Sequence, residues 1–122
     1  MRQQFGQQSE QVVINFLKNQ NFSIVAHNFQ KFFGEIDIIA CKDDKLLFVE
    51  VKARKNSKVS LHDLVPYAKQ QKIIKVARCF IAQHASLAEN KILRFDVALL
   101  HCKDGQKPEL TYIENAFGAQ SY

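Results

Sequence analysis

Two carboxylates and a lysine stand inside apolar segments of the chain, where charge needs an explanation. Asp37 lies within residues 34–40, and Glu50 and Lys52 lie within residues 46–52. A divalent cation supplies a reason, because Mg²⁺ takes oxygen ligands and is commonly held by one or two carboxylates together with water and phosphate. Such a cation lowers the pKa of water, and Lys52 would stand beside that water. We therefore expect Asp37 and Glu50 to bind Mg²⁺ or Mn²⁺.

This expectation depends on the register of a β-hairpin. Both segments are rich in Ile, Val, Leu and Phe and are joined by the polar residues 42–45, which is typical of a hairpin. An even-numbered loop centred on this connection places Asp37 opposite Glu50, and it places Glu35 opposite Lys52. Directly opposed Cβ atoms lie about 4.5 to 5.5 Å apart, and like charges there destabilise a sheet. An odd-numbered loop would put the two carboxylates on opposite faces.

Side-chain alternation assigns the faces of both arms. The first arm divides into Ile36, Ile38 and Ala40 on one face and Glu35, Asp37 and Ile39 on the other. The second arm divides into Leu47, Val49 and Val51 against Phe48, Glu50, Lys52 and Arg54. A purely structural interpretation is a salt-bridge network in which Lys52 pairs with Glu35 and Glu50. That network leaves Asp37 without a partner unless Arg54 or a residue elsewhere supplies one.

The basic charge of the chain is concentrated next to these carboxylates. Residues 51–80 hold eight Lys and Arg against one acidic residue, whereas residues 1–50 hold five against six and residues 81–122 hold four against five. A concentrated basic surface attracts phosphate polyanions. The plainer interpretation is a solvated helix face with a basic loop. The basic residues of this segment are Lys52, Arg54, Lys55, Lys58, Lys69, Lys72, Lys75 and Arg78.

Length and composition indicate one globular domain. The chain has 122 residues, of which 47% are hydrophobic and 24% are charged, and this is the size of an ordinary domain. The longest apolar runs are far shorter than the roughly 20 residues that span a bilayer, so we expect no membrane association. The first residues contain no apolar signal region, and the three cysteines are odd in number and widely spaced. We therefore expect reduced thiols and a cytoplasmic location.

The hydrophobic pattern predicts the order α-β-β-β-α-β-β. A helical stripe runs over about residues 3–19, and a strand is predicted at 22–29 before the two hairpin arms. Pro66 fits the first turn of a helix that ends near His84. Residues 92–100 are apolar enough for a central strand, and residues 110–114 suit a short edge strand after a turn at Asp104-Gly105.

The motifs of the chain resemble those of the YraN family of small bacterial proteins, which are similar to archaeal Holliday-junction resolvases and to the PD-(D/E)xK nucleases. The central match is Gly-Glu-Ile-Asp at residues 34–37 followed by Phe-Val-Glu-Val-Lys-Ala-Arg at residues 48–54. Further matches extend the resemblance over nearly the whole chain. They are Gly6 with Glu10, His27-Asn28-Phe29, Lys69-Gln70 and Arg94-Phe95-Asp96-Val97.

The resemblance implies a fold and a set of site residues. The fold would be a restriction-endonuclease-like α/β core over residues 1–122, with a mixed central β-sheet flanked by helices. Asp37 and Glu50 would bind metal with the main-chain carbonyl of Val51, Glu10 would complete the site, and Lys52 would act on the attacking water. The chain departs from the superfamily by Gly-Glu-Ile instead of Pro before Asp37, and from its closer relatives by His27 instead of Arg.

Several of these residues also have plainer interpretations. Glu10 alone would be a solvent-facing helix residue, and Glu35 could orient Lys52 instead of binding metal. Residues that could contact nucleic acid are Arg54, Lys55, Lys58, Lys69, Gln70 and Lys72, with simple solvation as the alternative. Arg94 and Asp96 share a strand face, so we expect a structural ion pair rather than catalysis. The histidines and cysteines show no zinc-ligand spacing.

Three functional hypotheses follow. The first is a Mg²⁺- or Mn²⁺-dependent endonuclease that hydrolyses DNA phosphodiester bonds, in particular at branched or junction DNA. Paired cuts at a junction would require a twofold homodimer. The second is a nuclease-like protein that binds nucleic acid without cutting it and acts as an adaptor in DNA processing. The third is a protein-interaction domain whose charged hairpin face docks a partner, with only modest dependence on salt.

Overall fold

The computed structural model describes residues 2–55 and 58–118 of the chain, and the side chains of residues 6–55 and 58–118. The main elements follow the predicted order α-β-β-β-α-β-β. Two four-residue helices that the hydrophobic pattern did not indicate flank the long central helix. The bounds are α1 Arg2–Asn19, β1 Ser23–Lys31, β2 Gly34–Lys42, β3 Lys45–Arg54, α2 Leu61–Leu64, α3 Tyr67–Gln83, α4 Ala85–Ala88, β4 Ile92–His101 and β5 Glu109–Phe117.

Within the described residues, five strands form one mixed sheet in the order β1-β2-β3-β4-β5. Neighbouring strands are antiparallel except β3 and β4, which are parallel over their whole length. The parallel pair requires a crossover, and α3 supplies it. The mixed α/β fold that the resemblance implied is therefore confirmed. The last strand is longer than predicted, because it runs from Glu109 to Phe117 rather than over residues 110–114.

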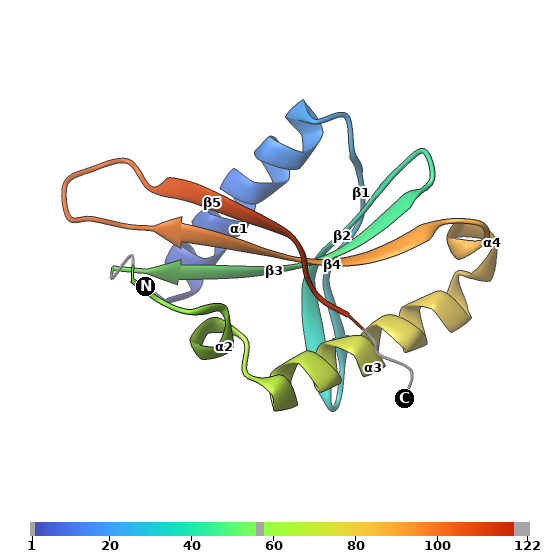
Figure 1. Ribbon diagram of the computed structural model, residues 1–122. Coiled ribbons are helices and arrows are strands. Elements are labelled where there is room, and N and C mark those ends of the chain that lie inside the picture. Colours follow the sequence, from blue (N-terminus) through green and yellow to red (C-terminus); the bar gives the residue numbers. More distant parts are fainter. Residues whose placement is uncertain (1, 56–57, 119–122) are drawn as a thin grey trace.

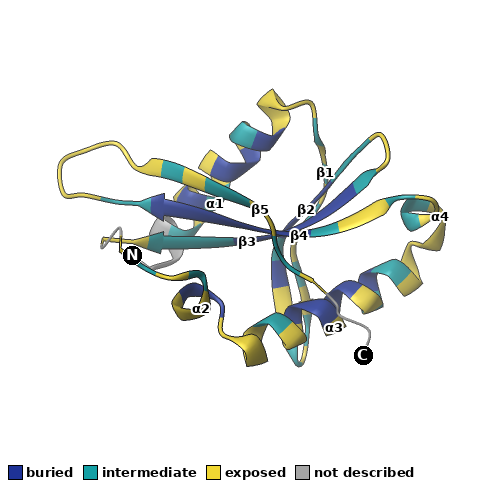
Figure 2. Ribbon diagram, viewed as in Figure 1, coloured by how far each residue is buried: buried dark blue, intermediate teal, exposed yellow. Residues whose placement is uncertain are grey.

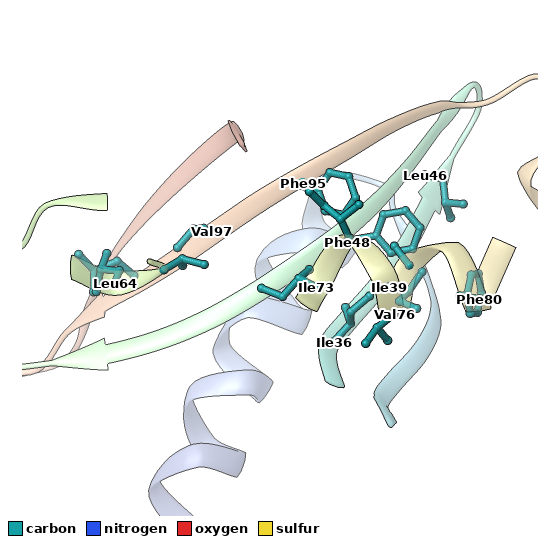
Figure 3. Packing of buried hydrophobic residues seen from close by; sticks show 14 residues of the cluster. Ile36, Ile39, Leu46, Phe48, Leu64, Ile73, Val76, Phe80, Phe95 and Val97 are labelled. Atoms are coloured by element: carbon teal, nitrogen blue, oxygen red, sulfur yellow. The ribbon is translucent and has the colours of Figure 1, made fainter. Parts of the chain in front are cut away.

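The sheet is packed between α1 on one face and α3 on the other (Figure 1). Val13, Ile14 and Leu17 of α1 pack against one apolar cluster of the sheet. The opposite cluster contains Phe48 and Phe95 of the parallel strands together with residues of α3, as Figure 3 shows for Val76 and Phe80. Burial is greatest in the middle of β3 and β4 and on the inner sides of the helices (Figure 2).

The hairpin has the even register on which the metal expectation depends. Lys42 pairs with Lys45, so the loop consists of Asp43 and Asp44 alone, and the ladder continues to Ile38 opposite Val49. Asp43 takes a φ of 51°, which aspartate tolerates better than most residues. Every pair in this ladder is the one that an even-numbered loop centred between Asp43 and Asp44 predicts, so the register is confirmed as far as Ile38 opposite Val49.

Beyond the Ile38–Val49 pair the two arms separate, and here part of the prediction was wrong, because neither Asp37 with Glu50 nor Glu35 with Lys52 forms a ladder pair. Glu35 does not pair with Lys52, because Glu35 lies opposite Gln30 of β1 and accepts a hydrogen bond from its amide at 3.1 Å. The alternation also breaks at this point. Ile36 belongs to the cluster under α3, whereas Ile38 belongs to the cluster under α1. Strand β2 therefore turns away from β3 at Asp37 (Figure 1).

The packing of Gly34 accounts for the direction of this turn. A Cβ atom on Gly34 would lie 3.3 Å from Cγ2 of Val76 in α3, so glycine lets the start of β2 lie close to the helix. Helix α3 itself carries its buried residues on one side, including Ile73, Val76 and Phe80.

No helix in the described part of the chain is long and apolar enough to cross a membrane.

Candidate functional site

The separation of β2 from β3 creates the place where the predicted site residues meet. Asp37 lies one residue beyond the last ladder pair, and its Oδ2 accepts a hydrogen bond of 2.8 Å from the main-chain N–H of Val51. A side-chain carboxylate thus replaces a main-chain carbonyl as the partner of this strand N–H. The bond fixes Asp37 at the fork between the strands and leaves its other oxygen for a further partner.

Glu50 is the most heavily buried acid of this site. It retains 4% of its accessible surface, and the ammonium groups of Lys52 and Lys69 each lie 3.9 Å from its Oε2. Burial, followed by the hydrogen bond with Asp37 and the negative charge of Asp37, raises the pKa of Glu50 from 4.5 to about 9, against the smaller opposing effect of the lysines. Without a bound cation, Glu50 therefore keeps its proton at neutral pH, and its O–H donates a hydrogen bond to Asp37.

Glu10 approaches the same fork from the opposite face of the sheet. Its Oε1 lies 2.7 Å from Nε2 of His27, and 16% of its side chain is exposed. Burial first, and then the negative charge of Asp37, raises the pKa of Glu10, while His27 and Asn28 act in the other direction. Glu10 is thus a half-buried neighbour of Asp37 rather than a solvent-facing helix residue. Because the strands part here, side chains from both helices reach one place.

An open hollow of about 210 Å³ adjoins the fork on the side of α1. Glu10, Asp37 and Val51 contribute to its walls, and Gly6, Ser9, Ala53 and Arg54 complete them. The Gly6 and Glu10 positions that the resemblance singled out thus lie in the same wall. The hollow provides space beside the carboxylates for a hydrated ion or a phosphate group.

The donor set suits a hard divalent cation bound by two carboxylates. Among the residues that the structure describes, no three His, Cys, Asp or Glu side chains gather into a group able to hold a metal ion. A cation between Asp37 and Glu50 would therefore be completed by a main-chain carbonyl and by water, which is usual for Mg²⁺. Burial, and then the neighbouring Asp37, raises the pKa of Glu50, and a bound cation would oppose both effects by stabilising the ionised carboxylate.

The predicted nucleic-acid-binding residues fall into separate environments. Lys69 lies at the site beside Glu50, and Lys72 lines a neighbouring hollow. Gln70 instead donates its side-chain amide to the carbonyl of Val65 at 3.0 Å, which fastens the segment before α3. Arg54 and Lys55 are exposed at the end of β3, where Lys55 lies 3.8 Å from Asp104. Lys58 is exposed in the connector that follows.

The expected ion pair between Arg94 and Asp96 is confirmed. The Nε of Arg94 lies 3.0 Å from Oδ1 of Asp96, and the hydroxyl of Tyr112 donates to Oδ2 at 2.6 Å. Asp96 also accepts from the main-chain N–H of Asn115 at 2.9 Å. This buried network joins β4 to β5 on the face that α1 covers.

Sequence reasoning missed two contacts of the site. His27 was noted as a departure from the related motif but not as the partner of Glu10, although a strand at this position pairs His27 with Ile38 next to Asp37. Lys69 was assigned to phosphate binding and not to the neighbourhood of Glu50. The spacing of basic residues along α3 could not indicate that Lys69 lies beside Glu50, because this contact depends on where α3 crosses β3.

Comparison with known proteins places the chain among small proteins of nearly its own length. The profile of a family described as "Uncharacterised protein family UPF0102" matches residues 9–100. A UPF0102 protein of Geotalea daltonii is 40% identical over 113 residues, which cover 92% of this chain and 87% of the relative. Relatives of the same name occur in Francisella tularensis subsp. novicida, at 35% identity over 94% of this chain and 95% of the relative, and in Clostridium perfringens, at 37% identity over 92% of each. The chain therefore belongs to the UPF0102 family.

Proposed function

We propose that this UPF0102 protein is a divalent-metal-dependent endonuclease that hydrolyses phosphodiester bonds of DNA, in particular at branched or junction structures. The proposal joins the fork geometry to the resemblance with YraN proteins and PD-(D/E)xK nucleases. One observation carries it above the others. Glu50 is an almost fully buried carboxylate set against Asp37, and its nearest cations lie 3.9 Å away.

Burying two adjacent acids costs folding free energy, and the same two acids could hold a catalytic metal ion. A buried ionised carboxylate needs a close partner, and two such acids side by side stay ionised together only when a cation joins them. Perturbed pKa values of this kind cluster at functional sites. Asp37, Glu50 and the carbonyl of Val51 would bind Mg²⁺ or Mn²⁺, with Glu10 on the opposite side of the fork. The bound ion would supply charge neutralisation at the phosphate and a lowered pKa for water.

The remaining residues of the site orient the reactants. Lys52 extends from the same strand as Glu50 and donates a hydrogen bond to the attacking water, which directs a lone pair of its oxygen toward phosphorus. The new bond joins this oxygen to phosphorus, the bond to the leaving sugar oxygen breaks, and solvent takes up and returns the protons. Lys69 of α3, which approaches the same oxygen of Glu50 as Lys52 does, would pair with a non-bridging phosphate oxygen. Glu35 lies beside Lys72 at the next hollow and is assigned to substrate positioning.

The test is cleavage of labelled linear, nicked and four-way-junction DNA by purified protein with Mg²⁺ and with Mn²⁺. Asp37→Asn retains an acceptor for the N–H of Val51 but removes the charge, so it separates chemistry from folding. We expect Asp37→Asn, Glu50→Gln and Lys52→Ala each to reduce the cleavage rate by at least about 100-fold. Asp44→Asn and Lys91→Ala remove the same charges outside the site and serve as matched controls.

Two results would contradict the proposal. One is the absence of cleavage with every substrate and metal, and the other is cleavage that persists in the Asp37 and Lys52 variants. Cutting both strands of a junction symmetrically calls for a twofold homodimer. Sedimentation with and without junction DNA tests this arrangement, and a monomer under both conditions speaks against it.

A second candidate function is binding of nucleic acid without cleavage, as an adaptor in DNA processing. The observation that favours it is the lack, among the described residues, of a cluster of three potential metal ligands. Such a protein would bind DNA with a steep dependence on salt through its basic residues. Titration with Mn²⁺ separates the candidates, because the endonuclease should bind the ion and the Glu50→Gln variant should not, whereas the adaptor binds DNA equally well in both forms.

A further inference from the structure

The tip of the hairpin between β1 and β2 presents a bare aromatic ring to solvent. Phe32 is 99% exposed, which exceeds the other large apolar side chains that the structure describes. Lys31 pairs with Gly34, so Phe32 and Phe33 are the whole turn. Two-residue hairpin turns favour Asn, Asp and Gly, and therefore local folding gives no reason for two phenylalanines here.

The turn is held in place although Phe32 itself is exposed. The ring of Phe33 meets that of Phe32 edge to face with centroids 5.0 Å apart, and Nζ of Lys75 lies 4.7 Å from the centre of the Phe33 ring. Gly34 allows the strand behind the turn to pack against Val76 of α3. The contacts of Phe33 and Gly34 thus hold the turn that carries the Phe32 ring. This reduces the conformational entropy that the turn loses when a ligand binds.

Positive charge connects this tip to the proposed site. A hollow of about 180 Å³ lies behind the turn, and Phe33, Lys69 and Lys72 contribute to its walls together with Gly34, Glu35 and Ile73. Lys69, in the same wall, lies 3.9 Å from Glu50. The acid in this wall, Glu35, accepts a hydrogen bond from Gln30. An anionic chain that leaves the fork would therefore meet Lys69, then Lys72, and then the aromatic tip.

We infer that the β1–β2 tip binds unpaired nucleobases, with Phe32 as a stacking platform and Lys31, Lys69, Lys72 and Lys75 as contacts to the adjoining phosphates. The inference deepens the proposed function, on which it rests, by assigning single-stranded segments next to the cut as the substrate feature. Basic grooves combined with exposed aromatic rings are the usual means of binding single strands. Bases inside a duplex have both faces covered by their neighbours, so only unpaired bases offer a free face.

The spacing between the tip and the fork fits a short length of nucleic acid. Five residues separate Phe32 from Asp37, so at most about 17 Å of chain lies between them. A strand held by Phe32 would thus place a phosphate within a few nucleotides of the stacked base at the carboxylates.

The chain contains no tryptophan, and this makes a direct test available. Phe32→Trp introduces a single fluorescent ring at the tip, and stacking of a base on it quenches the emission. The protein is titrated in EDTA, which prevents cleavage, with oligothymidylate, oligouridylate and a blunt duplex of equal length. We expect quenching by one or both single strands and little by the duplex. The relative affinity of the two single strands then reports whether DNA or RNA is preferred.

Two further variants provide the controls. Ile92→Trp places the reporter on another exposed apolar residue, 59% accessible at the start of β4, and its emission should not respond to the single strand. Phe32→Ala should weaken single-strand binding about tenfold, because base stacking on an aromatic ring contributes about 1 to 3 kcal/mol. Phe32→Tyr, which retains the ring, should restore it.

The outcomes separate this inference from the proposed function. Single-strand binding that Phe32→Ala leaves unchanged, or equal quenching of both reporters, overturns the stacking role even if the protein cleaves DNA. Loss of binding in Phe32→Ala sustains the stacking role even if no substrate is cut. Quenching that increases with protein concentration without nucleic acid would assign the tip to contact between copies of the chain and would overturn the inference. Binding of nucleic acid solely as duplex would overturn it as well.

Discussion

Two buried carboxylates on the paired strands β3 and β4 differ in what surrounds them. Asp96 is opposite Val49, one step along the ladder from Glu50, and the two acids are 0% and 4% exposed. Asp96 receives hydrogen bonds of 2.6 to 3.2 Å from Arg94, Tyr112 and Asn115. Glu50 has lysine ammonium groups at 3.9 Å and a second acid beside it.

The difference shows how burial of an acid can serve two purposes. Asp96 lies on the face of the sheet that α1 covers, where its partners satisfy the charge and join β4 to β5. Glu50 lies toward α3 at the fork, where its neighbours are a second acid, Asp37, and two lysine ammonium groups at 3.9 Å. A buried acid paired closely with a cation holds structure together, whereas an acid buried against a second acid weakens the fold unless a cation joins the two. Stability measurements test this distinction.

The largest expected effect comes from removing the satisfied acid. Asp96→Ala leaves the guanidinium of Arg94, 16% exposed, without its close partner, and breaking a buried pair in this way costs about 3 to 5 kcal/mol of unfolding free energy. The measurement is urea denaturation at pH 7. Glu114→Ala is the matched control, since this acid is 69% exposed and 3.8 Å from the same arginine, and its loss should change stability by less than about 1 kcal/mol. Equal losses of unfolding free energy in the two variants would mean that Asp96 stabilises the fold no more than an exposed acid does.

The second substitution, Glu50→Gln, should raise the free energy of unfolding at neutral pH instead of lowering it. The folded protein keeps a proton on Glu50 up to about pH 9, whereas the unfolded chain loses it near 4.5. The folded state thus binds more protons between these values, and stability falls as pH rises, by up to about 1.4 kcal/mol per pH unit. Glu50→Gln removes this dependence while retaining an N–H for Asp37. From pH 5 to pH 7 we expect the variant to gain about 3 kcal/mol relative to the parent protein.

Denaturation curves at pH 5, 7 and 9 in metal-free buffer test this expectation. Glu35→Gln is the control, because it removes a carboxylate of the neighbouring strand that lies outside the fork. Its pH dependence should follow that of the parent protein. A Glu50→Gln variant that is less stable than the parent at pH 7 would mean that Glu50 is ionised and well satisfied. The contrast with Asp96 would then disappear.

The sequence predicted the register because two strong local signals agreed. Apolar alternation in both arms and a polar connection centred on Asp43 and Asp44 left one pairing that buries the apolar residues. The order of elements followed from similar periodic signals. The ion pair of Arg94 with Asp96 also followed from local spacing, because residues two apart on a strand share a face.

The fork itself could not be predicted from these patterns. Alternation continues past Ile38 in the sequence, but the ladder stops there because the start of β2 packs on α3 through Gly34. The positions of Lys69 and Glu10 beside the carboxylates depend likewise on where the helices cross the sheet. The four-residue helices α2 and α4 are shorter than any window in which a helical period can be recognised.

The third prediction concerns binding of a cation by the Asp37–Glu50 pair. Mn²⁺ at 100 times its dissociation constant should stabilise the parent protein by about 2.7 kcal/mol, since an ion that binds only the folded state adds to its free energy of unfolding. Asp37→Asn and Glu50→Gln should not be stabilised, and Asp44→Asn, an acid of the hairpin turn, should respond as the parent does. Because Glu50 is protonated before binding at neutral pH, binding should also release close to one proton.

Calorimetric titration at pH 7 in two buffers of different ionisation enthalpy measures that proton together with the affinity. A proton released by the parent and by Asp44→Asn, with an affinity that rises as pH approaches 9, assigns the ion to the Asp37–Glu50 pair. Binding without proton release, or binding that survives Glu50→Gln, would locate the cation elsewhere on the chain. The burial of Glu50 would then require a partner other than a metal, and the nearest ones are the ammonium groups of Lys52 and Lys69, each 3.9 Å from its Oε2.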